Sequence, residues 1–129
     1  MRELVAAQPV ARFASLAPDG RAQLVPICFA LDGDRLWSAV DAKPKRTQHL
    51  GRLANIARDP RVTLLIDHYE EDWERVWWVR LDGLASVAEE RRRGVELLMD
   101  RYPQYRSQPP AGPVIEVAIT RWIGWTGEP

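Results

Sequence analysis

Hydrophobic residues in the first third of the chain fall in short runs separated by turn-forming residues, a pattern typical of β-strands. The runs lie at residues 10–17, 22–31 and 35–40. Pro18, Asp19 and Gly20 predict a tight turn after the first run, and Asp32 to Asp34 predict a second one. We therefore expect a three-stranded meander, preceded by a short helix within residues 1–7.

The hydrophobic period changes after residue 44 to that of an amphipathic helix, which Asp59 and Pro60 end. The residues expected on its apolar face are Leu50, Leu53, Ala54 and Ala57. A fourth strand follows at 61–69, and a long strand at 75–87 contains Gly83, which suggests a bulge or sharp bend.

The remaining sequence predicts a second helix and a last strand. The expected buried stripe of this helix consists of Val95, Leu98, Met99 and Tyr102. A proline-rich loop at 107–113 leads to a strand at 114–125. The resulting order, β-β-β-α-β-β-α-β, predicts a mainly antiparallel β protein with flanking helices.

Several of these strands are apolar on both faces, notably 62–66 and 76–81. Both sides of such a sheet need a cover, which a barrel interior can give on one side and helices or a partner on the other. So large an apolar display on 129 residues favours a homodimer of single-domain subunits, each spanning residues 1–129.

Composition and charge exclude several classes of protein. The 18 basic and 18 acidic side chains cancel, which argues against general nucleic-acid binding. The single cysteine, Cys28, lies in an apolar run and is expected to be buried, and a lone cysteine with two histidines offers neither a disulfide nor a metal site. The longest apolar stretch, 22–31, is too short to span a bilayer, and no signal peptide precedes it. We expect a cytoplasmic protein with no membrane partner.

The most unusual segment carries the three cations Lys43, Lys45 and Arg46, followed by the hydroxyl of Thr47, where a strand gives way to a helix. Cations at a helix N-terminus oppose the macrodipole, so they favour stability only when an anion is bound there. The segment therefore predicts a binding site for a phosphorylated ligand, and the alternative is a solvated helix entry. It contains no P-loop motif.

These residues belong to a stretch that resembles the pyridoxamine-phosphate-oxidase-like split β-barrel proteins, in particular the branch that uses the deazaflavin coenzyme F420. The resemblance rests on residues 10–17 with 19–21, 24–29, 41–47 and 53–62, and residues 67–69 and 73–80 are similar to an actinobacterial subgroup. It implies a six-stranded antiparallel split β-barrel (the FMN-binding split barrel) that forms a homodimer with two cofactor sites in the subunit interface.

The resemblance also implies roles for particular residues. The cofactor phosphate would be held by Lys43, Lys45 or Arg46 with Thr47, and Arg52 is a further candidate. The ring system would lie along the second strand near Val25 and Pro26. Trp77 and Trp78 are candidate walls, with the core as their alternative place, and Trp122 or Trp125 would come from the other subunit.

The implied function is an F420-dependent oxidoreductase that transfers a hydride between the deazaflavin and a small organic acceptor. Two alternatives remain: an FMN-dependent oxidoreductase, since FMN also carries a phosphate on a ribityl chain, and a non-catalytic binder of F420, a flavin or a tetrapyrrole. The sequence contains no G-x-S-x-G or H-E-x-x-H motif. His68, beside Asp67, is a candidate proton donor or a surface histidine, and Asn55 is expected to be a structural hydrogen-bonding residue.

Overall fold

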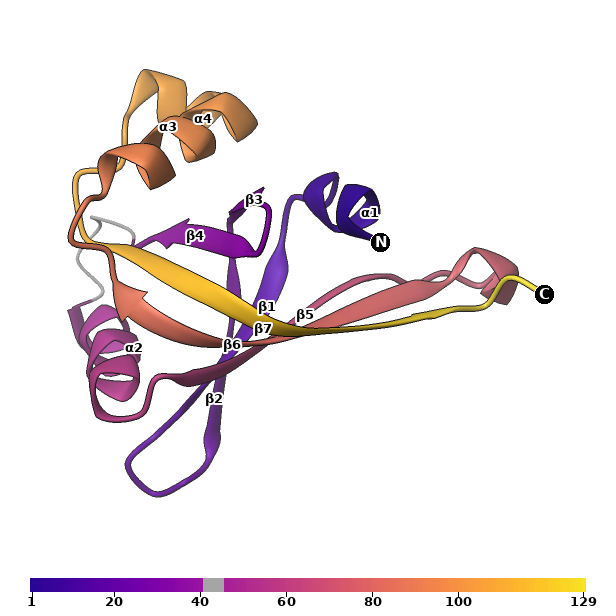
Figure 1. The fold of residues 1–129 in the computed structure, drawn as a ribbon, viewed down its shortest axis with the longest axis horizontal. Coiled ribbons are helices and arrows are strands. Elements are labelled where there is room, and N and C mark those ends of the chain that lie inside the picture. The colour runs from indigo at the N-terminus through magenta and orange to yellow at the C-terminus, as the bar shows by residue number, and fades with distance from the viewer. Residues whose placement is uncertain (41–45) are drawn as a thin grey trace.

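The structure is a computed structural model that describes the backbone of residues 1–40 and 46–129 and the side chains of residues 1–40 and 51–129. Within these residues one curled antiparallel sheet forms the body of the molecule, with helices around it (Figure 1). Its strands are β1 (Ala11–Leu16), β2 (Ala22–Ile27), β3 (Ala30–Asp32), β4 (Arg35–Ala39), β5 (Arg61–His68), β6 (Trp77–Val87) and β7 (Val114–Thr126). The helices are α1 (Arg2–Ala6), α2 (Arg46–Arg58), α3 (Arg92–Arg101) and α4 (Pro103–Ser107), with a 3-10 turn, η1, at Trp73–Arg75.

The strand order is β2-β1-β5-β6-β7-β4-β3, so the predicted meander is present only as two separate hairpins, β1–β2 and β3–β4. The second predicted strand breaks after Ile27: β2 pairs with β1 at one edge of the sheet, and β3 pairs with β4 at the other. Tyr102 gives the physical reason, because its hydroxyl accepts from the backbone N–H of Phe29 at 2.9 Å and donates to the Phe29 carbonyl at 3.0 Å. These groups are thereby withdrawn from strand pairing, and the described chain has seven strands where six were expected.

The same break overturns the expectation for Cys28, which is exposed. It lies between two buried residues, Ile27 and Phe29, just after the end of β2. The apolar run around it therefore did not indicate its burial.

The core lies on the concave side of the sheet, which we call the inner face and which carries Phe13, Leu64 and Leu81 on neighbouring strands. The alternate residues Arg12, Leu65 and Arg80 define the outer face. Each fully buried large apolar side chain contributes about 1.5–3 kcal/mol relative to an exposed one. The largest buried side chains are Phe13, Phe29, Leu36, Leu64, Ile66, Leu81, Leu98 and Ile115.

Helix α2 occupies the predicted place, but it presents a different face to the sheet. Asn55 and Ile56 are buried and Leu53 is partly buried, whereas Ala54 and Ala57 are exposed. The apolar spacing mispredicted the helix rotation because a polar contact of Asn55, described below, sets it. The side chain of Leu50 lies outside the described residues.

Strands β6 and β7 form a long hairpin that extends from the body as an arm, with η1 and the C-terminus at its tip (Figure 1). The predicted bulge is present as a register shift between Asp82 and Gly83. A Cβ on Gly83 would lie 2.7 Å from the Ala118 carbonyl oxygen, so the close approach of β7 requires a glycine there.

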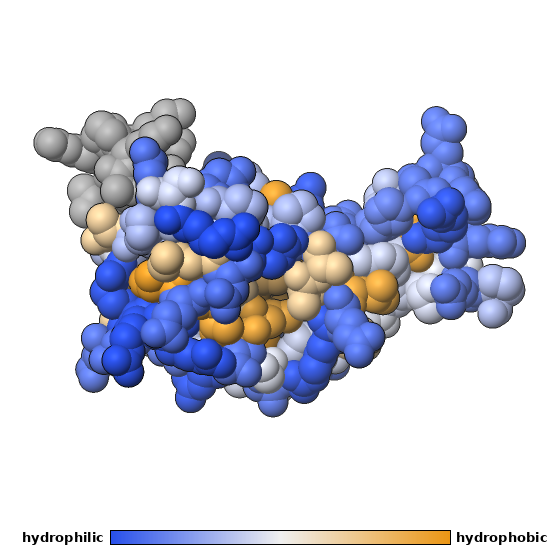
Figure 2. Space-filling model, turned by 90° about the horizontal axis from the view of Figure 1, so that it is seen from above, coloured by the Kyte–Doolittle hydropathy of each residue, from blue (hydrophilic) through white to orange (hydrophobic). Residues whose placement is uncertain are grey.

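The predicted second helix is also confirmed, because α3 buries Leu98, with Tyr102 just beyond its end, and Val95 and Met99 are partly buried. Seen from above, the molecule is mostly hydrophilic, with hydrophobic surface gathered near the middle of this face (Figure 2). A hollow of about 260 Å³ lies between α1 and α3, lined in part by Ala6, Leu31 and Leu97. The N-terminal helix and α3 thus leave a shallow gap above the sheet.

Candidate functional site

The basic segment that the sequence singled out lies largely outside the described residues. Lys43 and Lys45 belong to the undescribed part of the chain. Arg46 and Thr47 form the first turn of α2, as predicted, but their side chains are not described. The assignment of these four residues to a phosphate therefore stays a prediction.

The position of α2 is set by a polar contact with the sheet. The side-chain amide of Asn55, which is 2% exposed, donates to the Ser15 hydroxyl at 3.1 Å and to Gln23 Oε1 at 2.5 Å. Arg58 donates to Asn55 Oδ1 at 3.0 Å and to the Leu16 carbonyl at 2.6 Å. Asn55 is thus the structural hydrogen-bonding residue that we expected, and it anchors the helix against β1 and β2.

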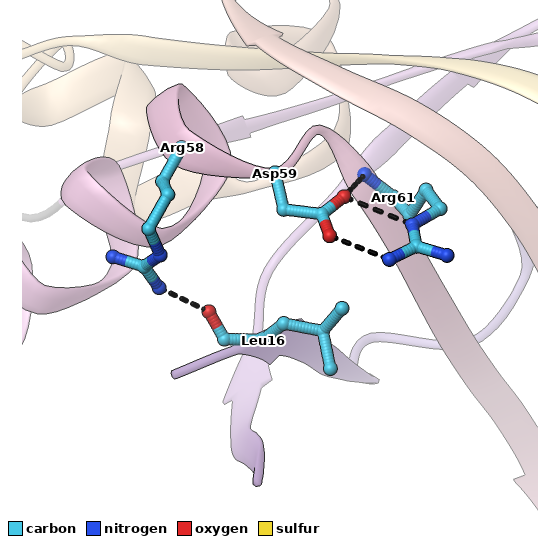
Figure 3. A network of polar contacts seen from close by, with 4 residues as sticks. All are labelled: Leu16, Arg58, Asp59 and Arg61. Atoms are coloured by element: carbon cyan, nitrogen blue, oxygen red, sulfur yellow. Dashed lines mark hydrogen bonds and ion pairs between the residues drawn. The ribbon is translucent and has the colours of Figure 1, made fainter. Parts of the chain in front are cut away.

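The turn from α2 to β5 is held by an ion pair. Asp59 accepts from the Arg61 backbone N–H at 3.1 Å, from Nε at 3.0 Å and from a terminal guanidinium nitrogen at 2.7 Å (Figure 3). The hydrogen bonds from Arg61 lower the pKa of the Asp59 carboxyl to about 2. Figure 3 shows this pair beside the Arg58–Leu16 contact, so the ion pair closes the turn itself and Arg58 ties the end of α2 to β1.

Among the predicted phosphate-binding residues, Arg52 has a described side chain, and that side chain has the features of an anion-binding residue. It lies one helical turn before Asn55, and its side chain is half-buried. Its Nε atom is buried and has no hydrogen-bond partner among the described residues, and burial lowers the pKa of the guanidinium. An unsatisfied buried donor costs about 1–3 kcal/mol, more when it is charged. A phosphate oxygen at this place would satisfy the donor and compensate the charge.

The two residues predicted to support a ring system point to opposite sides of β2. Val25 lies on the same side as Gln23 and packs against the core. A Cβ on Gly51 of α2 would lie 3.5 Å from Gln23 Nε2, so α2 covers this side of the strand. Pro26 is exposed on the outer face, opposite Arg12. Only Val25 therefore shares a side of β2 with α2 and its Arg52.

Trp77 and Trp78 are also divided between the two faces. Trp77 packs against the core on the inner face, and Trp78 lies on the outer face opposite Asp67 and Trp125. Strand β6 is three strands away from β2, which corresponds to about 14 Å across the sheet. Within one chain the structure does not bring these tryptophans next to Val25.

The two tryptophans of β7, Trp122 and Trp125, differ in their contacts and exposure. The Trp122 indole donates to Asp34 Oδ1 at 3.1 Å, and the Arg2 guanidinium lies 4.5 Å from the centre of its ring. Hydrogen bonds from Arg2 and Trp122 lower the pKa of the Asp34 carboxyl. Trp122 is therefore engaged within its own chain, whereas Trp125 is 49% exposed and accessible to a second subunit.

The outer face contains polar residues that the sequence reasoning missed. Two adjoining hollows, of about 330 Å³ and about 520 Å³, share Arg61, Val62 and Thr63 in their walls. The Thr63 hydroxyl donates to Asp82 Oδ1 at 3.1 Å; Arg80 Nε lies 3.4 Å from the same atom but is not aligned for a hydrogen bond. Polar residues at alternate positions of β5 and β6 were the available signal for this surface.

His68 lies on the arm, where its Nε2 contacts the carboxylate of Glu70. Its sequence neighbour Asp67 pairs instead with Arg12 at 3.2 Å. The ring of His68 is partly exposed and directly opposite Trp77 in the strand register. This is the environment of a surface histidine with a carboxylate partner, and its role as a proton donor stays a prediction.

In the part of the chain that the structure describes, no three histidine, cysteine, aspartate or glutamate side chains gather in a way that could hold a metal ion. None of the described helices is both long and apolar enough to cross a membrane.

Comparison with known proteins identifies the relatives of this chain. The family model of pyridoxamine 5'-phosphate oxidase matches residues 1–126. A comparison with curated protein sequences found no match.

Solved structures share the fold at low sequence identity. A conserved hypothetical protein of Mycobacterium tuberculosis is 20% identical with a TM-score of 0.78, covering 97% of this chain and 81% of that one. A protein described as an F420 reductase is 23% identical with a TM-score of 0.70, covering 95% and 94%. The haem storage protein HutZ of Vibrio cholerae is 12% identical with a TM-score of 0.70, covering 97% and 90%. Proteins with this split-barrel fold thus include both an enzyme and a storage protein.

Proposed function

The chain belongs to the pyridoxamine 5'-phosphate oxidase family, and on this basis we propose that it is a coenzyme F420-dependent oxidoreductase that transfers a hydride between the deazaflavin and a small organic acceptor. The family match supports a flavin-like ligand. The F420 reductase among the structural relatives supports the choice of F420.

The observation that carries the proposal is the buried Nε of Arg52, which has no hydrogen-bond partner among the described residues. A guanidinium presents a planar set of donors that suits a phosphate group, and it stays charged even when burial lowers its pKa. Among the described residues no carboxylate forms an ion pair with it. The fold therefore partly buries the charged guanidinium of Arg52, and an anionic ligand would offset the free-energy cost of its lost hydration.

The residues around Arg52 would fix the geometry of such a ligand. Asn55 and its contacts hold α2 in place, so the guanidinium is presented from a rigid element. Val25 offers an apolar surface on the same side of β2. Bound F420 in its reduced form supplies the hydride, and the protein binds, orients and desolvates it. Lys43, Lys45, Arg46 and Thr47 remain the predicted additional phosphate contacts.

The second subunit belongs to the same proposal. The outer face carries Leu24, Leu65 and Leu84, which are 63%, 39% and 48% exposed in the single chain. Exposed apolar residues on a broad sheet face are typical of an interface between subunits. A homodimer across this face would cover them, and it would bring Trp78 and Trp125 of one subunit toward the other.

The test compares two arginine-to-alanine variants of equal charge change. In Arg52→Ala we expect the affinity for F420 to fall about 10- to 100-fold, because one charge-assisted contact contributes roughly 1.5–3 kcal/mol. Arg92→Ala is the matched control, since Arg92 is a helical arginine whose side chain is 81% exposed. Titration monitored by tryptophan fluorescence measures both. If Arg52→Ala binds F420 as tightly as Arg92→Ala, Arg52 does not contact the ligand and the proposal loses its main support.

A further inference from the structure

A further pocket lies between α1 and the hairpin arm. The arm extends away from α2 (Figure 1). Its volume is about 260 Å³. The N-terminal segment contributes Met1 and Leu4 to its lining, and the arm contributes Trp77, Trp78, Val79, Gly124, Trp125 and Thr126. Arg52 does not line it, but it includes Trp78 and Trp125, which the homodimer proposed above would bring toward the second subunit.

One wall of the pocket is formed by α1, and contacts on the far side of this helix hold it in place. Val5 is completely buried beneath the helix. Arg2 donates to the Gly33 carbonyl at 2.9 Å and pairs with Asp34 at 2.7 Å, and Arg101 donates to the Ala6 carbonyl at 3.3 Å. These contacts leave Met1 and Leu4 over the arm, 56% and 48% exposed.

The wall of the pocket formed by β7 allows the N-terminal segment to approach the strand closely. Gly124 of β7 has no side chain, and a Cβ there would lie 2.6 Å from Met1 Cε. The space next to Gly124 is therefore bounded by apolar atoms of the N-terminal segment and by the tryptophans of the arm. Trp125 is itself 49% exposed, so the pocket opens to solvent along this edge.

The lining indicates what kind of molecule would fit. No charged side chain lines the pocket, so a charged ligand would lose hydration without gaining a charged side chain as a partner. Tryptophan offers a large flat surface that favours aromatic rings. The Thr126 hydroxyl oxygen accepts from the Glu128 backbone N–H at 3.2 Å, which leaves its own O–H as a donor.

We propose that this pocket binds a small neutral molecule that combines a planar aromatic ring system with one hydrogen-bond acceptor. The volume of about 260 Å³ lies just below the roughly 300–1,000 Å³ of sites for drug-sized ligands, which points to one or two fused rings.

Isothermal titration calorimetry with 2-acetylnaphthalene, a neutral two-ring ketone, tests this assignment. We expect one saturable site with a Kd of roughly 100 µM. The anion 2-naphthoate has the same ring system and should bind at least about ten-fold more weakly, because no charged side chain of the pocket compensates the hydration that its carboxylate loses. Absence of saturable binding by the ketone, or equal binding of the ketone and the anion, would overturn the assignment.

Variants locate the site. Gly124→Leu should reduce binding of the ketone at least ten-fold, because the new side chain enters the pocket beside the flexible end of Met1. Leu4→Ala should weaken it about five-fold through lost apolar contact. Val87→Ala is the control, since Val87 is 47% exposed, lies at the end of β6 and does not line the pocket. A thermal melt of each variant establishes that it is folded. If Leu4→Ala binds the ketone as tightly as Val87→Ala, the ligand lies elsewhere.

Discussion

Replacement of Asn55 by alanine tests how α2, which carries Arg52, is anchored to the sheet. The side chain of Asn55 donates to Ser15 and Gln23 and accepts from Arg58, and it is 2% exposed. Alanine removes these three hydrogen bonds. It also leaves the Ser15 hydroxyl, which is 2% exposed, without this donor.

The expected cost follows from the hydrogen bonds and from the partners left behind. Each bond contributes about 1 kcal/mol net, and an unsatisfied buried partner adds about 1–3 kcal/mol, so we expect the free energy of unfolding to fall by roughly 2–4 kcal/mol. That is a large part of the roughly 5–15 kcal/mol that stabilises a typical domain. Urea unfolding monitored by tryptophan fluorescence measures the difference.

Two further variants make the assay specific. Gln104→Ala removes an exposed amide on α4 and should change the free energy of unfolding by less than about 0.5 kcal/mol. The double variant Asn55→Ala/Ser15→Ala should lose less than the sum of its single variants, by about 1 kcal/mol, because the two residues share a bond. A loss below about 0.5 kcal/mol for Asn55→Ala, with additive single effects, would refute the view that this contact positions α2.

Two other predictions concern the strand break and the α2–β5 turn. Tyr102→Phe should lower the free energy of unfolding by about 1–3 kcal/mol, measured in urea, because it leaves the buried N–H of Phe29 without its acceptor; wild-type stability would show that another group accepts it. Asp59→Asn should be less stable than the wild type at neutral pH, because Arg61 depresses the folded-state pKa of Asp59 from 3.8 to about 2. A depressed carboxyl pKa stabilises the folded state fully above about pH 4, and this stabilisation is lost as the pH falls through about 2. The difference in melting temperature between the wild type and Asp59→Asn should therefore shrink over that interval. A difference independent of pH would contradict the assignment.

The sequence was sufficient for those features that depend on local pattern. Short apolar runs between turn-forming residues located the strands, apart from the break after Ile27, and Gly83 indicated the bulge that the register shows between Asp82 and Gly83. The boundaries of α2 follow from Pro44, which excludes an earlier start, and from Pro60, which ends it. Each of these signals acts over a few residues, so a single sequence contains it completely.

The features that were mispredicted depend on contacts between distant residues. The strand break at Phe29 is stabilised by Tyr102, which lies 73 positions away. The rotation of α2 depends on the contact of Asn55 with Ser15, 40 positions away, and it buries an amide in place of Ala54. No local pattern encodes such pairs. The division of Trp77 and Trp78 between two faces does follow from strand alternation, but their distance from Val25 follows only from the strand order.

The central claim, that this member of the pyridoxamine 5'-phosphate oxidase family uses F420, is tested most directly by parallel titration of the purified apo protein with F420 and FMN. Quenching of its six tryptophans reports binding of either cofactor. We predict saturable quenching by F420 with a Kd of about 1–10 µM, and binding of FMN at least ten-fold weaker. Tighter binding of FMN, or no saturable quenching by either cofactor, would contradict the claim.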